Sequence, residues 1–246
     1  MTVLPNYNSP LIDSRDFILS TSLAKKALSE SFLPGFTNIL RDIIEEMYYL
    51  AKSCHLPEFT EHGLPHVCSV VKRISDWGDS VGWLEKLKDN EASILLLAAI
   101  VHDIGMLTQN KADLEEQNFS DYNTIDIPLW VRSTHSKRIF KILDRTIIQP
   151  RYNQEMIRKG LKLVSEIARA HSVDQEQYEN NLKINDLCSF FKLDKQRQFA
   201  LASIISVADL LDEDGERCDT KRLLENKHST TISKAHWIRH TMTHRR

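Results

Sequence analysis

The chain has 246 residues, of which 41% are hydrophobic and 27% charged, and its net charge is −2. This composition is typical of a globular protein with a sizeable core, and the near-zero charge points to no particular partner. Four scattered cysteines without a Cys-x-x-Cys pair argue against a disulfide framework and a zinc ribbon. The longest apolar run, residues 94–101, is too short to span a membrane, and the N-terminal sequence lacks a signal-peptide pattern. We therefore expect a cytoplasmic protein without a membrane partner.

Apolar residues recur at helical spacing almost throughout, and convincing strand-like alternation is missing. Residues 39–50 and 67–78 predict the first two core helices, with the second ending at its Trp-Gly pair. Asn90 is expected to cap a strongly apolar helix that runs to Ile104 and that Gly105 ends.

The second half of the chain continues this helical pattern after a polar interruption. Residues 106–132 predict a long loop or insertion, with Pro128 near its end. Helices are then expected over residues 133–150, closed by a proline, and over residues 153–171. A last core helix follows over residues 194–211, where Asp at the first position is the N-cap.

These patterns predict an all-α fold. We expect a single globular helical bundle over residues 36–215, with an N-terminal helical extension, residues 1–35, and a basic C-terminal tail, residues 216–246. The tail could meet phosphates or be an ordinary solvated segment.

Metal-ligand residue types occur at well-separated positions, nearly all on stretches expected to be helical. They are His66, His102-Asp103, His135, His171 and Asp209. Three of these positions have an ordinary alternative: a salt bridge or helix cap for His102-Asp103, a core histidine for His66 and a C-terminal cap for His171. His135 is expected in the first turn of its helix, where the dipole disfavours a cation and a neutral, ligating imidazole fits better. The aspartate in the last apolar helix is harder to explain, because burial without a cation would raise its pKa and destabilise the fold.

Together these residues lie on different core helices, and facing helices of a bundle can bring side chains to one ion. A shell of His, Asp and water suits Mn, Fe, Co or Zn better than calcium. The sequence therefore predicts a divalent transition metal as cofactor, as one or two ions.

The pattern resembles the HD-domain superfamily of metal-dependent phosphohydrolases. Its His, its His-Asp pair and its downstream Asp match His66, His102-Asp103 and Asp209. Dinuclear members hold a second metal with two intervening histidines, whose order His135 and His171 follow. The resemblance implies that Asp103 bridges two ions with its two oxygens, and that a water of lowered pKa attacks a phosphoester.

Two further similarities extend this resemblance. His62 lies four residues before His66, where helical cyclic-nucleotide phosphodiesterases place the histidine that protonates the leaving oxygen. The C-terminal block around residues 210–240 looks like HD domains found ahead of Hsp90-type ATPase modules in bacteria. If the chain is part of a longer protein, this likeness implies an Hsp90-like ATPase module as its partner.

We therefore expect a metal-dependent phosphohydrolase acting on a nucleotide or another small phosphorylated substrate, with His62 and Asp103 as catalytic residues. Lys137, Arg138 and Arg217 could bind phosphate oxygens or could be ordinary surface charges. Glu61 or Asp212 could orient a ligand, and the sequence does not decide between them. The alternatives are a nuclease on single-stranded nucleic acid and a non-catalytic, metal-bound module that senses a nucleotide.

Overall fold

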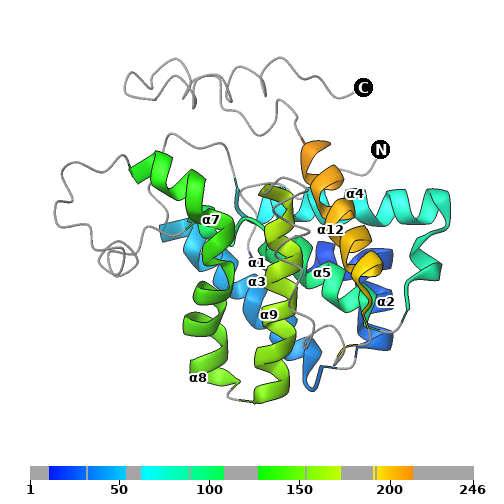
Figure 1. The fold of residues 1–246 in the computed structure, drawn as a ribbon, viewed down its shortest axis with the longest axis horizontal. Helices are drawn as coiled ribbons and strands as arrows, with labels where there is room; N and C mark the ends of the chain where they lie inside the picture. Colours follow the sequence, from blue (N-terminus) through cyan, green and yellow to red (C-terminus); the bar gives the residue numbers. More distant parts are fainter. Residues whose placement is uncertain are drawn as a thin grey trace.

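The computed structural model describes residues 11–31, 33–53, 62–88, 90–107, 127–152, 154–172, 191 and 193–212. Within these ranges the chain is helical and contains no strand, which confirms the all-α fold (Figure 1). The helices are α1 (Leu11–Ser20), α2 (Ser22–Glu30), α3 (Phe36–Ser53), α4 (Leu64–Val81), α5 (Glu91–Val101), α7 (Ile127–Leu143), α8 (Gln149–Arg151), α9 (Glu155–Arg169) and α12 (Lys195–Leu210). Short 3-10 or π turns join some of them: η1 (Leu84–Lys86), η2 (Ile104–Leu107), η4 (Asp144–Ile148) and η5 (Ala170–Ser172). No helix in the described part of the chain is long and apolar enough to cross a membrane.

Helix α5 lies at the centre of the bundle (Figure 1). Every one of its residues is buried, and α2, α3, α4, α9 and α12 all pack against it. A helix that is apolar all round can be stable only when neighbours cover it on every side. Because α5 ends at Val101, the two residues that follow, His102 and Asp103, are carried into the interior.

The start of α5 differs from the prediction. Asn90 occupies the N-cap position, but it has a positive φ of 72° and its side chain makes no capping hydrogen bond. The neighbouring Glu91 carboxylate accepts the backbone N–H of Lys88 at 2.7 Å and pairs with the Arg197 guanidinium from α12. Glu91 is thus a buried acceptor that ties α5 to α12, a role that local sequence does not indicate.

Helix α4 continues beyond the predicted stop at Gly78 and ends at Gly82, whose φ is 72°. A Cβ on Gly78 would lie 2.9 Å from the Cβ of Leu84 and 3.2 Å from the ring of Trp83. Gly78 therefore permits close packing of η1 against α4 rather than ending the helix, and Gly82 supplies the left-handed C-terminal residue.

The predicted start of the helix over residues 133–150 is wrong, whereas its predicted end at Pro150 lies one residue from Arg151, where α8 ends. Helix α7 begins at Ile127 rather than near Ser133, with Pro128 in its first turn, where a missing N–H costs little. The helical path continues through η4, a π turn, and then through α8, which contains Pro150. His135 consequently lies well inside α7 and not in its first turn, so the helix dipole does not account for a neutral ring at this position. Residues 108–126 of the predicted loop lie outside the described residues.

The other predicted helix boundaries agree better with the structure. The Asp194 carboxylate caps α12 by accepting the backbone N–H of Arg197 at 2.8 Å, as predicted. Helix α9 ends at Arg169, and His171 follows in η5. Asn153, the expected cap of α9, lies outside the described residues. Helices α1 and α2 pack against α4, and α2 also packs against α5, while the domain boundaries at residues 35 and 215 stay predictions.

Candidate metal centre

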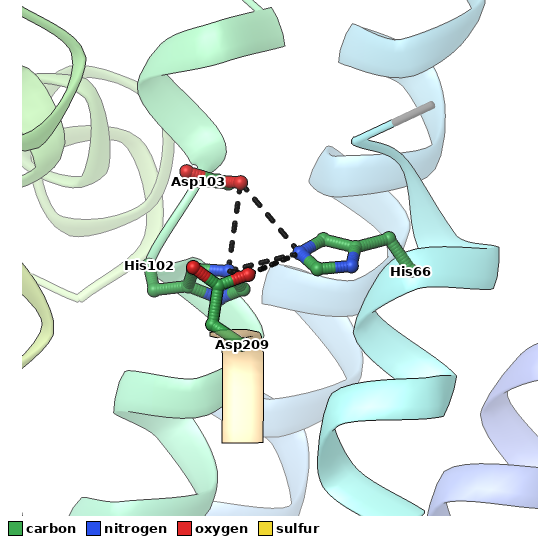
Figure 2. Close-up of side chains that lie close together, drawn as sticks. All are labelled: His66, His102, Asp103 and Asp209. Atoms are coloured by element: carbon green, nitrogen blue, oxygen red, sulfur yellow. Dashed lines mark hydrogen bonds and ion pairs between the residues drawn. The ribbon is translucent and has the colours of Figure 1, made fainter. Parts of the chain in front are cut away.

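Four predicted ligand residues converge where α4 begins, α5 ends and α12 ends (Figure 2). His66 comes from the first turn of α4, His102 and Asp103 follow α5, and Asp209 lies in the last turn of α12. Their donor atoms all lie within 4.8 Å of one another, and Figure 2 shows the side chains pointing toward one another.

The separations within this first group suit a single ion. The Nε2 atoms of His66 and His102 are 3.0 Å apart, and Asp209 Oδ1 lies 3.3 Å and 3.6 Å from them. Asp103 Oδ2 lies 3.6 Å and 3.5 Å from the same two nitrogens. Two ligands bound at about 2.1 Å and separated by about 90–120° are about 3.0–3.6 Å apart, so these atoms could share one transition metal.

A second group lies beside the first. The Nε2 atoms of His135 on α7 and His171 in η5 are 3.1 Å apart, and both face the Asp103 carboxylate. Asp103 Oδ1 lies 3.6 Å from the His135 nitrogen and 3.3 Å from the His171 nitrogen. These three residues could hold a second ion.

Asp103 divides its two oxygens between the groups. Oδ2 faces His66 and His102, whereas Oδ1 faces His135 and His171. Asp103 is buried, so neither oxygen is turned to bulk water. A carboxylate in this position has one oxygen for each of two neighbouring cations.

The protonation of the histidines also fits a cation. In His102, His135 and His171 the Nδ1 atom lies 2.6–2.8 Å from a backbone carbonyl three residues earlier. A carbonyl oxygen only accepts, so Nδ1 donates, and a neutral ring then has its lone pair on Nε2. Lone pairs that face each other at about 3 Å repel unless a cation lies between them.

Burial and charge set the ionisation of the same groups. Burial would raise the pKa of Asp103, but the neighbouring His102 and His62 side chains hold it well below its usual range. Burial would likewise raise the pKa of Asp209, and the neighbouring His102 and His66 side chains lower it further than burial raises it. The carboxylates therefore stay ionised, which is the form that ligates a metal.

The pKa values of the two histidines of the second group shift in opposite directions. Burial lowers the pKa of His135 to about 4, so that its ring is neutral near pH 7. Burial would also lower the pKa of His171, but its hydrogen bond to Asp103 and the carboxylate charge raise it overall. The Asp103 carboxylate thus stabilises positive charge at the second group.

His62 lies at the edge of the first group. Its Nδ1 donates to Asp103 Oδ2 at 2.8 Å, and its ring packs edge-on against that of His66. Part of the side chain is exposed, unlike the rings of His66 and His102. The predicted catalytic histidine is therefore in contact with the bridging carboxylate, and its role as an acid stays a prediction.

Gly105 sets the distance between the two groups. A Cβ on this residue would lie 2.6 Å from the carbonyl carbon of His135 and 2.7 Å from its Cα, with the carbonyl oxygen closer still. The turn after Asp103 can therefore approach α7 only because residue 105 has no side chain. Arg138 stabilises this contact between the turn and α7, since its guanidinium donates to the Gly105 carbonyl at 2.5 Å.

Replacing Gly105 with Ala should separate α7 from this turn and weaken the second group more than the first. The added methyl meets backbone, which cannot rotate away, so we expect a loss of about 1–3 kcal/mol in unfolding free energy. Metal analysis should give fewer ions per chain than in the wild type. Gly35→Ala is the matched control, because its φ of +70° is strained for alanine but no atom lies within 4 Å of its Cβ. That variant should lose stability and keep its metal, and equal metal content in both variants would count against the role of Gly105.

The predicted phosphate-binding residues are spread over different places. Lys137 is exposed on α7, and Arg138 is buried, with its guanidinium on the Gly105 carbonyl and stacked over Trp130. Arg138 therefore supports the turn, and phosphate binding by either residue stays a prediction. Arg217 lies outside the described residues.

Arg132 was missed by the sequence reasoning. It is half-buried on α7, one turn before His135, and its carbonyl accepts from the ring of His135 at 2.7 Å. Burial lowers the pKa of Arg132, and the charge of Asp103 partly offsets this, so the two side chains interact across the site. The three-residue spacing between Arg132 and His135 is a usable signal, but it points to a shared helix face only if residues 127–132 are helical, and the sequence predicts a loop over residues 106–132.

Comparison with known proteins identifies the family. The HD-CE family matches residues 56–246, which is more than half of the chain. The chain belongs to this HD-domain family. The predicted resemblance to HD domains is therefore confirmed. No match was found among curated proteins or among solved structures.

The HD-CE match and the buried His/Asp cluster together support a metal-dependent HD-type domain. The match begins ahead of α4 and includes the part of the chain that supplies both ligand groups. The cluster could hold a metal ion, and the expected choice of Mn, Fe, Co or Zn stays a prediction.

Proposed function

We propose that this HD-CE chain is a metal-dependent phosphohydrolase that cleaves a phosphoester of a nucleotide or a related small molecule. The observation that carries the proposal is the division of the Asp103 oxygens between two groups of ligand nitrogens. A bridging carboxylate between two cation sites is suited to in-line displacement at phosphorus, where the attacking and leaving oxygens both need stabilisation.

In this proposal, one ion would be held by His66, His102, Asp103 and Asp209, and the other by Asp103, His135 and His171. When bound, the metals would supply a water whose pKa is lowered toward neutrality and positive charge that offsets the charge on the phosphoryl group. The ionised carboxylates of the two groups and the neutral ring of His135 are the protonation states that this role needs.

Two further residues complete the proposed chemistry. His62 donates through Nδ1 to Asp103, so its Nε2 is the atom from which a proton would pass to the leaving oxygen. Arg132 is our candidate for binding a phosphate oxygen, because a guanidinium pairs well with phosphate and its charge acts on the same carboxylate.

A substrate panel tests the proposal. Metal-stripped protein reloaded with Mn²⁺ or Co²⁺ should hydrolyse at least one nucleotide, cyclic nucleotide or small phosphate ester, and a chelator should stop the reaction. Cleavage restricted to labelled single-stranded oligonucleotides would favour a nuclease. Metal-bound protein that is inert toward the whole panel, yet stabilised by a nucleotide in thermal unfolding, would favour a sensing module. Either result would contradict the proposed function.

A further inference from the structure

His66 is held differently from the other three histidines of the centre. His102, His135 and His171 each donate Nδ1–H to the carbonyl three residues earlier. His66 lies in the first turn of α4, where no earlier helical turn exists. The carbonyl three residues before it, that of Gly63, accepts the backbone N–H of Val67 at 3.2 Å. His66 therefore needs an acceptor from elsewhere in the fold.

Asp212 provides this acceptor. It follows the end of α12, where its backbone N–H donates to the carbonyl of Asp209 at 2.9 Å. Its Oδ2 lies 2.8 Å from Nδ1 of His66, and its side chain is almost completely buried. A carboxylate oxygen accepts, so Nδ1 carries the proton and Nε2 of a neutral ring offers its lone pair to the ligand cluster.

The second oxygen of Asp212 is held by α4 itself. Oδ1 accepts the Ser69 hydroxyl and the Arg73 Nε–H, the latter at 3.0 Å. His66, Ser69 and Arg73 follow one another at spacings of three and four residues, so they lie on one face of α4. One oxygen of the Asp212 carboxylate thus accepts from the imidazole, and the other accepts from the Ser69 and Arg73 side chains. These contacts prevent the carboxylate from rotating and exchanging its two oxygens.

We propose that Asp212 is a positioning residue that fixes His66 as the Nδ1–H tautomer and so presents Nε2 to the metal. The end of α12 then supplies both a ligand, Asp209, and the support for a ligand on another helix, His66. A carboxylate acceptor also makes Nε2 of the imidazole a stronger electron-pair donor to a metal than a backbone carbonyl acceptor does, since partners behind a metal-bound histidine tune its basicity. This inference rests on the proposed metal site, but its first test needs no metal.

Asp212→Asn tests the tautomer directly because it preserves shape. Ser69 and Arg73 are donors, so they should keep the amide oxygen on their side and turn the NH₂ group toward His66. An amide N–H facing Nδ1 requires the opposite tautomer, with the proton on Nε2. The ring would then turn an N–H toward the cluster and could not ligate until it changed tautomer.

The experiment is nitrogen NMR of histidine-labelled, metal-free protein, followed by a Co²⁺ titration read by visible absorption. Wild-type His66 should be the Nδ1–H tautomer and the Asn variant the Nε2–H tautomer. Co²⁺ affinity should fall about 10- to 100-fold, the usual effect of losing such a partner, with altered absorption bands. Asp194→Asn, on the same helix but at its capped start, is the matched control and should leave affinity and bands unchanged.

Either of two results would overturn the proposal. The first is an Nε2–H tautomer at His66 in the wild-type chain, which can be read even if the variant does not fold. The second is a folded Asn variant whose Co²⁺ affinity and bands match those of the wild type. If wild-type protein has the Nδ1–H tautomer but binds no Co²⁺, the proposed metal site fails while the positioning of His66 by Asp212 stands.

Discussion

Asp103→Ala should remove bound metal and abolish hydrolysis. One oxygen of Asp103 faces each group of ligand nitrogens, so a single substitution takes a ligand from both proposed ions. The substitution also removes the carboxylate that stabilises positive charge among the imidazoles of the two groups. A catalytic metal supplies several kcal/mol of transition-state stabilisation, so kcat/KM should fall by at least about 10³-fold. Metal content per chain should fall with it.

Two controls separate this effect from loss of the fold. Asp76→Ala removes an exposed carboxylate from α4 that pairs only locally with Lys72, so it should keep both metal and activity. Thermal unfolding of metal-free Asp103→Ala should still give one cooperative transition. A folded Asp103→Ala protein with the metal content of the wild type would show that the cluster is not the metal site.

His62→Asn should slow hydrolysis by about 10²- to 10⁴-fold while metal content stays unchanged. The ring donates to Asp103 but does not belong to either group of converging ligand atoms, so its loss should not release an ion. The loss should fall on kcat, because the proposed proton transfer occurs during bond cleavage rather than in binding.

The leaving group distinguishes an acid from a binding residue. An ester with a p-nitrophenolate leaving group needs little protonation, so the variant should approach wild-type rates on it, whereas an alkyl or nucleoside ester should show the full loss. An equal loss on both esters, or loss of metal, would contradict the role of His62 as the general acid.

The sequence predicted the fold class and most helices because apolar spacing records which faces are buried. Asp194 was recognisable as a cap, since capping depends on residues three positions apart. Gly78 is typical of a helix end, but here it permits close packing of η1 against α4, and the helix continues to Val81. The predicted end at Pro150 agrees with the structure to within one residue, since α8 ends at Arg151. The apolar stretch that ends at Val101 predicts the buried central helix. It does not predict that the helix ends there in a turn rather than continuing to Ile104.

The ligand cluster could be anticipated because its residue types lie on separate core helices, and the structure brings all six predicted ligand residues into two adjoining groups. Asp209 is less buried than expected and is partly exposed at the end of α12. The contact of Gly105 with α7 and the partner of His66 are tertiary features between distant segments. No local pattern records them, and Arg132 was hidden by a misplaced helix start.

The most direct test is a titration of metal-stripped wild-type protein with Mn²⁺, Co²⁺ and Zn²⁺, with bound ions counted by elemental analysis and located by anomalous diffraction. We predict two ions per chain, one among His66, His102, Asp103 and Asp209 and the other among Asp103, His135 and His171. No saturable binding, or an ion located away from Asp103, would contradict the proposed centre.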